Sequence, residues 1–434
     1  MIKVGILGLG TVGGGTANVL QRNADEISRR VGAHIEVVIA SVRDLAADRI
    51  CDCDGLELTQ DPMAVVNHPD VDIVVELIGG ETIAKQLILQ AIAQGKHVVT
   101  ANKALIALHG GEIFAAASAK GVSVLYEAAV AGGISIIKSL REGMAANRIE
   151  LVAGIINGTA NFILTEMRDK ARTFEDVLAE AQALGYAEAD PTFDVEGIDA
   201  AHKLTILASI AFGIPLQFDK VYTEGISNLS LADVAYAREL GYQIKHLGIA
   251  KLVEGGIELR VHPTLIPGKR LIANVDGVMN AVLVKGDAVG NTLHYGAGAG
   301  AEPTASAVVA DIVDIARYID SEASSRVPPL GFQSDSIVTK TVKRPSEFMS
   351  AYYLRIDVKD VPGVMSKLST IFADLNVSIE GITQKEPHKG EQNVSVIFLT
   401  QRTMEAQIET AIDRIQAMPD VLDTVSRIRV EYLD

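Results

Sequence analysis

Residues 3–13 read Lys-Val-Gly-Ile-Leu-Gly-Leu-Gly-Thr-Val-Gly, a short apolar run that leads directly into closely spaced glycines. The run is typical of a buried strand, and a segment with helical periodicity follows it. In a G-x-G-x-x-G motif between strand and helix, Gly8 permits the tight turn, Gly10 lets the backbone approach a pyrophosphate, and Gly13 lets the helix pack closely on the strand. The motif therefore predicts a dinucleotide site; the alternative is a purely structural turn. The residues expected to contact the cofactor here are Gly8, Gly10, Thr11, Val12 and Gly13.

The rest of the N-terminal third alternates strands with helices. Apolar strands are expected at residues 35–40, 71–75, 97–100 and 123–126, with helical segments between them. Continuous apolar strands separated by helices indicate a parallel sheet with both faces covered. We therefore predict that residues 1–130 form a Rossmann-type, doubly wound parallel sheet.

The end of the second strand bears on the choice between NAD and NADP. An NAD site usually has an acidic residue there, which binds the ribose 2′-hydroxyl. This chain has Arg43 near that position, with Ser41 before it and Asp44 just beyond. Because a guanidinium can bind a 2′-phosphate with two hydrogen bonds, NADP is favoured, with NAD possible. The alternative is a surface ion pair of Arg43 with Asp44 or Asp48.

Length, charge and cysteine content restrict the class of protein. The 434 residues suggest about three domains. A formal net charge of −16 argues against a nucleic-acid or anionic-membrane partner, since both need a basic surface. Cys51 and Cys53 form neither a disulfide framework nor a zinc-binding pattern, which fits a reducing compartment. Because no apolar stretch is long enough to span a bilayer and no cleavable leader is recognisable, we expect a cytoplasmic enzyme.

Beyond the first domain, strands and helices no longer alternate strictly, so residues 131–302 are expected to form an α+β domain for catalysis and dimerisation. Within it, segment 185–199 contains five acids and no base, among them Glu188, Asp194 and Asp199. On charge alone, an ordinary surface loop is as good an interpretation as a binding site.

The helix expected after this segment favours the binding site. Asp199 and Lys203 are four residues apart and project together, away from an apolar stripe. A solvated pair would stabilise the helix by only ~0.2–0.5 kcal/mol. However, the rest of the helix is nearly uncharged, which indicates burial and places the pair in an internal cleft. An ammonium group beside carboxylates is suited to hold an amino acid and to protonate a carbonyl. The neighbouring His202 is interpreted as a packing residue.

Two other segments are expected at the same cleft. Thr100 ends a predicted strand and Lys103 follows it, at the sheet edge where doubly wound folds bind ligands. The small-residue loop at 296–303 contains Gly300, whose backbone could approach the cofactor; an ordinary loop is equally compatible. The helix over 303–320 is expected to pack back on the first domain.

The C-terminal part indicates a separate module. Residues 321–349 are interpreted as a linker, and residues 350–434 have the order β-α-β-β-α-β of a ferredoxin-like unit. This unit contains no catalytic constellation, so a regulatory or oligomerising role is expected.

Taken together, these segments resemble the long bacterial homoserine dehydrogenases, which have a C-terminal ACT domain. The resemblance covers the whole chain. It is carried by residues 8–13, Thr-Ala-Asn-Lys at 100–103, Gly-Ile-Ile-Asn-Gly-Thr-Ala-Asn-Phe-Ile-Leu at 154–164, Gly-Tyr-Ala-Glu-Ala-Asp-Pro at 185–191, residues 199–203, and the less specific Asp-x-Pro-Gly-Val turn at 360–364.

The resemblance implies an enzyme that reduces aspartate 4-semialdehyde to homoserine with NADPH, on the route to threonine, methionine and isoleucine. Lys203 would be the proton donor and Lys103 would lie between cofactor and substrate. Glu188, Asp194 and Asp199 would bind the substrate. A monovalent cation, sodium or potassium, would be held by Glu127 with backbone oxygens at Val130, Gly132 and Ile134.

The resemblance also implies regulation and assembly. ACT domains bind small amino acids where two of them meet, here through Asp360, Gly363, Val364 and Asn376. Threonine is the expected effector, and the chain is expected to be a homodimer or homotetramer; the alternative is a module that only dimerises. Deletion from about residue 350 onward is expected to leave a catalytic core that ignores threonine. A different amino-acid dehydrogenase and a non-catalytic sensor are the remaining alternatives.

Overall fold

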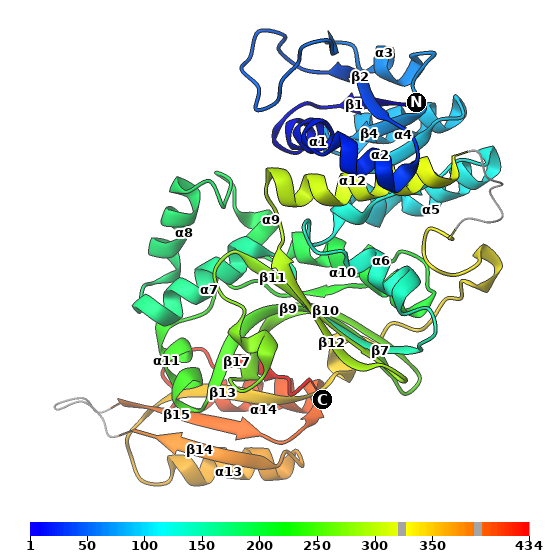
Figure 1. Ribbon diagram of the computed structural model, residues 1–434. Coiled ribbons are helices and arrows are strands. Elements are labelled where there is room, and N and C mark those ends of the chain that lie inside the picture. Colours follow the sequence, from blue (N-terminus) through cyan, green and yellow to red (C-terminus); the bar gives the residue numbers. More distant parts are fainter. Residues whose placement is uncertain (320–326, 386–392, 434) are drawn as a thin grey trace.

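The computed structural model describes residues 1–319, 327–385 and 393–433. Its N-terminal domain is a six-stranded parallel sheet of order β3-β2-β1-β4-β5-β6 (Figure 1). Helices α1, α2 and α12 cover one face, and α3, α4 and α5 cover the other, so the expected doubly wound sheet is confirmed. The elements are β1 (Ile2–Leu7), α1 (Thr11–Arg22), α2 (Ala24–Val31), β2 (Ile35–Ser41), β3 (Glu57–Thr59), α3 (Pro62–Asn67), β4 (Ile73–Glu76), α4 (Thr82–Ala93), β5 (His97–Thr100), α5 (Lys103–Lys120), β6 (Val124–Leu125) and α12 (Ala301–Tyr318).

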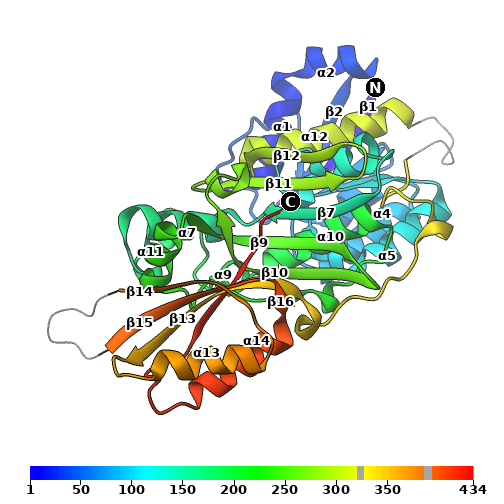
Figure 2. The ribbon, with the colours of Figure 1, turned by 90° about the horizontal axis from the view of Figure 1, so that it is seen from below.

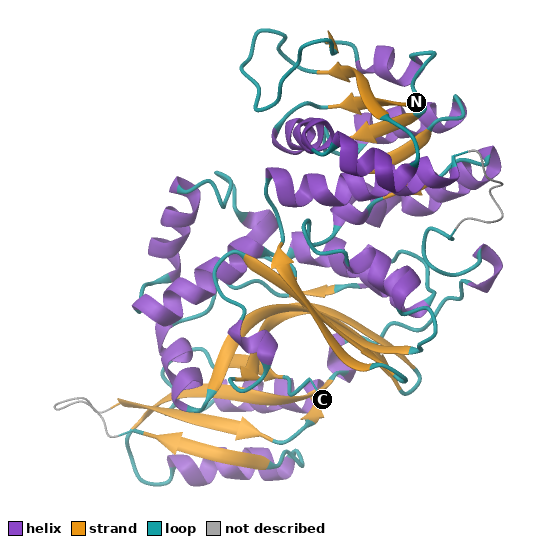
Figure 3. Cartoon of the chain, viewed as in Figure 1, coloured by secondary structure: helices purple, strands orange, loops and turns teal. Residues whose placement is uncertain are grey.

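The middle of the chain forms a second sheet of order β12-β11-β7-β9-β10, antiparallel throughout (Figure 3). Helix α10 lies on one face of this sheet and also packs against α5, which joins the first domain to the second. The elements are α6 (Ile136–Lys138), β7 (Ile149–Ile155), α7 (Gly158–Lys170), α8 (Phe174–Ala183), α9 (Thr192–Val195), α10 (Ile198–Phe212), β8 (Tyr222–Thr223), α11 (Leu231–Glu239), β9 (Tyr242–Val253), β10 (Gly256–Pro267), β11 (Met279–Gly286) and β12 (Gly290–Ala297).

The C-terminal domain has the expected β-α-β-β-α-β order, with its four main strands arranged β17-β13-β15-β14. Helices α13 and α14 lie side by side on one face of these strands (Figure 2). The elements are β13 (Met349–Lys359), α13 (Val364–Asp374), β14 (Ile379–Gln384), β15 (Asn393–Thr400), β16 (Thr403–Met404), α14 (Glu405–Gln416) and β17 (Ser426–Val430).

The sheets of the second and C-terminal domains are continuous, which the sequence did not predict. Strand β17 pairs in parallel with β10, so that Thr264 lies opposite Arg429. The segment expected as a linker also contacts this sheet, since the backbone N–H of Ile257 donates to the carbonyl of Thr341 at 2.9 Å. The C-terminal module is therefore fused to the catalytic sheet.

Within the described ranges, no helix is both long and apolar enough to cross a membrane.

Candidate active site

The turn after β1 leaves backbone exposed at the start of α1. Gly8 has φ +92°, and a Cβ on Gly13 would lie 2.1 Å from the carbonyl oxygen of Gly8. Gly10 is the N-cap of α1, and no atom lies within 4 Å of the position its Cβ would take. Thr11 and Val12 form the first helical turn. The turn thus offers free N–H groups and the positive end of a helix dipole to an anion.

A second helix begins beside this turn. Gly300, with φ +121°, is the N-cap of α12, and a Cβ on Gly15 of α1 would lie 2.7 Å from the carbonyl oxygen of Ala301. Arg22 and Glu302 form an ion pair of 2.6 Å between the two helices. Helix α12 starts at Ala301, two residues earlier than expected, because Pro303 is tolerated in the first turn, where its missing N–H costs no hydrogen bond. As expected, α12 packs on the first domain.

Arg43 lies two residues beyond the end of β2 and is exposed. Among the described residues, its guanidinium makes no hydrogen bond or ion pair, so the expected alternative pair with Asp44 or Asp48 is not formed. A neighbouring arginine, Arg49, instead donates to three backbone carbonyls of the same loop. Arg43 is therefore free to bind a ligand at this edge.

Buried polar groups connect the ends of β4 and β5. Thr100 donates its hydroxyl to Glu76 at 2.6 Å, and the other oxygen of Glu76 accepts two backbone N–H groups of the following loop. Asn102 caps α5 and donates to the carbonyl of Gly80 at 2.6 Å. Burial raises the pKa of Glu76. This network, which sequence reasoning missed, fixes the loop next to Lys103.

At the junction of the first two domains, one carboxylate lies between two lysines. Lys103 begins α5, and its Nζ lies 2.8 Å from Oδ1 of Asp199. Asp199 and Lys203 both lie on α10, one helical turn apart. The Nζ of Lys203 lies 2.7 Å from Oδ2 of Asp199 and 2.7 Å from the carbonyl oxygen of Ile156. Asp199 and Lys203 are buried, whereas the Lys103 side chain is 35% exposed. The structure thus brings together the two lysines that the sequence singled out.

The three charges affect one another unequally. Burial alone would raise the pKa of Asp199, but the two ammonium groups hold it well below its usual range. Burial lowers the pKa of Lys203, and the charge of Lys103 lowers it further. Burial also acts to lower the pKa of Lys103, but Asp199 and the acids beyond it raise it on balance. Lys203 is therefore the lysine that more readily gives up its proton.

Asn157 organises the acids of this site. It caps α7 by accepting the N–H of Ala160 at 2.7 Å, and its Nδ2 donates to Asp194 at 2.8 Å and to Asp199 at 2.9 Å. Sequence reasoning missed this role, although the residue lies within the conspicuous 154–164 string. In the sequence around Asn157, the one indication of a structural role is an asparagine at the N-cap position of a helix that follows a buried strand.

The other two acids of the segment that the sequence singled out differ in burial. Asp194, in α9, is half-buried, and burial raises its pKa. Glu188 is exposed in the loop before α9, yet close enough for its charge to raise the pKa of Lys103. The acids thus extend from the buried Asp199 toward the mouth of the site, which suits the amino group of a small substrate.

His202 has the packing role expected from the sequence. Its ring stacks on Phe218 at 4.2 Å and lies against Phe193 at 5.5 Å. Burial lowers its pKa to about 4, so it is uncharged at neutral pH.

The segment expected to hold a cation contains one buried acid, Glu127, which lies beside another, Asp311 of α12. The carboxylate of Glu127 accepts the N–H groups of Ile137 and Lys138 at 2.9 and 2.8 Å, and its own N–H donates to Asp311 at 2.7 Å. Burial raises the pKa of Glu127 to about 7 and that of Asp311 well above its usual value. In the described part of the chain, no three His, Cys, Asp or Glu side chains are arranged to hold a metal ion. A cation here would need backbone oxygens as further ligands; of the three expected from the sequence, at Val130, Gly132 and Ile134, the carbonyl of Ile134 also accepts the N–H of Ile136 at 2.7 Å.

The residues expected to bind an effector lie around α13. Gly363, with φ +93°, is the N-cap of this helix, Val364 is buried in its first turn, and Asp360 is exposed in the turn before it. Asn376 follows the helix, exposed and with φ +54°. The turn has the open helix N-terminus that an amino-acid carboxylate requires.

Three family models match the chain in succession. They are the homoserine dehydrogenase NAD-binding domain over residues 8–127, homoserine dehydrogenase over 136–313, and the ACT domain over 352–420. The homoserine dehydrogenase of Pseudomonas aeruginosa is 62% identical over 100% of this chain and 99% of its own, and that of Neisseria gonorrhoeae is 54% identical over the same shares. The crystal structure of a homoserine dehydrogenase from Thiobacillus denitrificans matches with a TM-score of 0.94 and 60% identity, over 100% of this chain and 99% of the other. The resemblance noted from the sequence is confirmed, and the chain belongs to the homoserine dehydrogenase family of NAD(P)-dependent oxidoreductases, with a C-terminal ACT domain.

Proposed function

We propose that Lys203 is the residue that exchanges a proton with the substrate oxygen when aspartate 4-semialdehyde and homoserine interconvert. The observation that supports this most strongly is the position of Lys203, buried against Asp199 at the junction of the dinucleotide-binding and catalytic domains. A bound nicotinamide nucleotide supplies or accepts the hydride. The test is the change in reduced-nicotinamide absorbance with homoserine as substrate, with aspartate in its place as the control.

Each charged group of the site then has a separate task. Lys203 donates its proton to the aldehyde oxygen during reduction and removes one from the hydroxyl during oxidation. Lys103, partly exposed on α5, contacts the substrate on the cofactor side. Glu188, Asp194 and Asp199 bind the amino-acid end of the substrate, and Asp199 also holds both lysines in place. The cofactor would be held by the N-termini of α1 and α12, with Thr100 and Lys103 at its nicotinamide end.

Replacing Asn157 by alanine is expected to lower kcat/KM for homoserine by roughly tenfold, the scale of a lost hydrogen bond from a neutral amide to a carboxylate. The amide normally holds Asp194 and Asp199 together, so its loss separates a substrate ligand from the lysine pair. Steady-state kinetics with saturating cofactor measures the effect. Asn274→Ala, which removes a surface amide that bonds only to backbone carbonyls, is the control. An unchanged kcat/KM would exclude this positioning role.

We also propose that NADP is the preferred cofactor, because Arg43 lies unpaired beside the end of β2. A hyperthermophilic archaeal homoserine dehydrogenase whose structure was solved in complex with NADPH supports this; it is 25% identical over 72% of this chain, with a TM-score of 0.59.

Arg43→Ala should therefore shift the ratio of kcat/KM for NADP over NAD toward NAD, by about tenfold for one lost charged contact. The comparison of both cofactors in one preparation measures it, and Arg49→Ala tests whether any arginine of this loop has the same effect. If the ratio is the same in Arg43→Ala and wild type, the assignment is wrong.

A monovalent cation is proposed at Glu127. Two buried acids with raised pKa values lie together there, and a bound cation would compensate their charge.

Threonine is proposed to inhibit the enzyme through the ACT domain, at the turn formed by Asp360, Gly363 and Val364 and at Asn376, where two such domains meet in a homodimer or homotetramer. The deletion suggested by the sequence is a poor test. Arg260 of β10 is fully buried and bonds to Glu431 at 2.6 Å, and β10 pairs with β17, so removal of the domain would break this ion pair and expose the edge of the catalytic sheet.

A point substitution in the complete chain tests the effector site instead. In the wild type, a coupling free energy of ~1–3 kcal/mol between the threonine site and the active site would change activity severalfold. Asn376→Ala should abolish this inhibition by threonine and leave kcat in the absence of threonine unchanged. Thr370→Ala, on the exposed side of α13, is the matched control. Equal inhibition of both variants by threonine would contradict the proposal.

A further inference from the structure

The last strand of the ACT domain contacts the catalytic domain through a cluster of charges around Glu224. Oε2 of Glu224 accepts from Arg429 at 2.8 Å, from Arg427 at 3.4 Å and from the hydroxyl of Tyr222 at 2.8 Å. Both arginines also bind Glu405 at the start of α14. Arg429 and Glu405 are buried on the ACT side of this cluster, and among the described residues Glu224 is the acid that the catalytic domain contributes to it.

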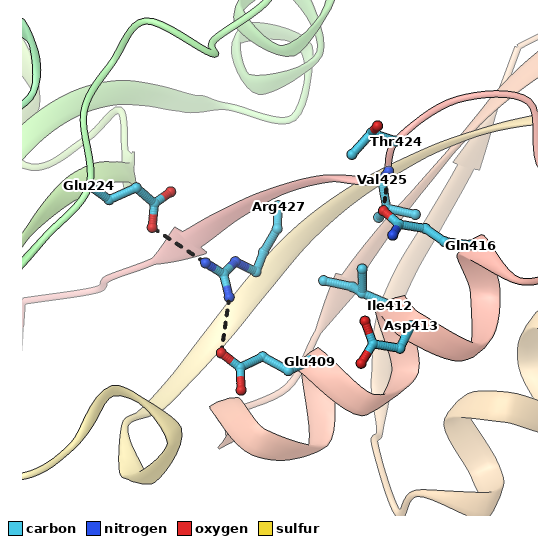
Figure 4. Close-up of a pocket in the computed structure, with 8 residues that line it drawn as sticks. All are labelled: Glu224, Glu409, Ile412, Asp413, Gln416, Thr424, Val425 and Arg427. Atoms are coloured by element: carbon cyan, nitrogen blue, oxygen red, sulfur yellow. Dashed lines mark hydrogen bonds and ion pairs between the residues drawn. The ribbon is translucent and has the colours of Figure 1, made fainter.

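Figure 4 shows Arg427 between two carboxylates, Glu224 from the catalytic domain and Glu409 from α14. They border a cavity of about 340 Å³ between α14 and β17. Glu224 and Glu409 contact the same guanidinium from different domains. A substitution at Glu409 is therefore a matched control for the same substitution at Glu224.

The residues that follow Glu224 lie directly against α9. The N–H of Ile226 donates to the carbonyl of Val195 at 2.9 Å, and the hydroxyl of Ser227 donates to Glu196 at 2.6 Å. A Cβ on Gly225 would lie 2.2 Å from the carboxylate of Glu196, so the two segments are in close contact. Any shift of Glu224 is thereby passed to α9.

A histidine fixes the same segment from the other side. Nε2 of His246 lies 3.0 Å from the carbonyl oxygen of Glu224, and its ring packs against Gly197, between α9 and α10. The path from the ACT strand to the helix that bears Asp194 is therefore a chain of direct contacts.

We infer that Glu224 is a positioning residue, through which Arg427 and Arg429 of the ACT domain hold α9 and set the affinity of Asp194 for the substrate. This inference rests on the proposed role of Asp194 in binding the amino-acid end of the substrate. Loss of the Glu224 contacts would let α9 move and weaken substrate binding, while the cofactor turn, which belongs to another domain, would be unaffected.

The test compares Glu224→Gln with Glu409→Gln in the complete enzyme. In Glu224→Gln the KM for homoserine should rise about fivefold to tenfold, the scale of a lost charged contact, while the KM for NADP stays within about twofold. Glu224→Asp should recover part of the loss, and Glu409→Gln should behave as wild type. Gly225→Ala, which forces the segment away from Glu196, should raise the KM for homoserine as Glu224→Gln does.

Two results would overturn the inference while leaving the proposed chemistry intact. One is an unchanged KM for homoserine in Glu224→Gln. The other is a rise in the KM values for both homoserine and NADP together with a fall in kcat and in Tm, which would indicate a merely structural ion pair. An unchanged KM for homoserine in Asp194→Asn would instead defeat the substrate role of Asp194, and this inference with it.

Discussion

Lys203→Ala should lower kcat by about 100-fold or more in both directions, the usual loss when a positioned proton donor is removed. The residue is suited to this role because its ammonium group is buried, is oriented by Asp199, and has a pKa lowered by burial. Proton transfer to the substrate would then fall to water, which the buried position excludes. Steady-state kinetics of homoserine oxidation and of aldehyde reduction measures the loss.

The pH dependence distinguishes a proton carrier from a structural lysine. Oxidation of homoserine requires neutral Lys203, so the rate of oxidation should rise as pH increases through the lowered pKa of this lysine. Reduction of the aldehyde requires protonated Lys203, so the rate of reduction should fall over the same pH range. Both pH dependences should disappear in Lys203→Ala. Lys251→Ala is the matched control, because Lys251 is another lysine whose pKa burial lowers, on β9. A folded Lys203→Ala enzyme with near-normal kcat would refute the assignment.

Local patterns predicted the parts of the molecule whose residues are close in sequence. Gly8 determines a tight turn by its positive φ, and Asp199 and Lys203 meet because a helix brings residues four apart to one face. The periodicity of residues 350–434 gave the order of the C-terminal strands and helices correctly.

Contacts between distant segments could not be read from the sequence in the same way. Asn157 is 37 residues from Asp194 and 42 from Asp199, and Arg429 is 205 residues from Glu224. Nothing in the neighbourhood of such a residue in the sequence indicates its partner. The pairing of β10 with β17 was missed for the same reason, because a strand edge that accepts another strand resembles any other apolar strand.

Asp199→Asn should be the most destabilising change in the site, and it should also lower kcat by about 100-fold or more. The carboxylate is buried and compensates two ammonium groups, at 2.8 and 2.7 Å. A neutral amide leaves both lysines together without their counter-charge, and breaking a buried pair in this way costs about 3–5 kcal/mol. Denaturant unfolding of the variant and wild type at neutral pH measures the difference in free energy.

The pH dependence of that difference tests the cause. The folded-state pKa of Asp199 lies well below its unfolded value, so the wild-type carboxylate stabilises the fold at every pH above the unfolded value of about 4. Its contribution is lost as pH falls from that value toward the lowered pKa, because the unfolded chain then binds the proton first. The gap between wild type and Asp199→Asn should therefore narrow progressively below about pH 4. Asp54→Asn, at an exposed carboxylate to which no described residue donates a hydrogen bond, should show almost no gap at any pH. A gap of constant size from neutral to acid pH would mean that lost packing, and not the charge between two lysines, destabilises the variant.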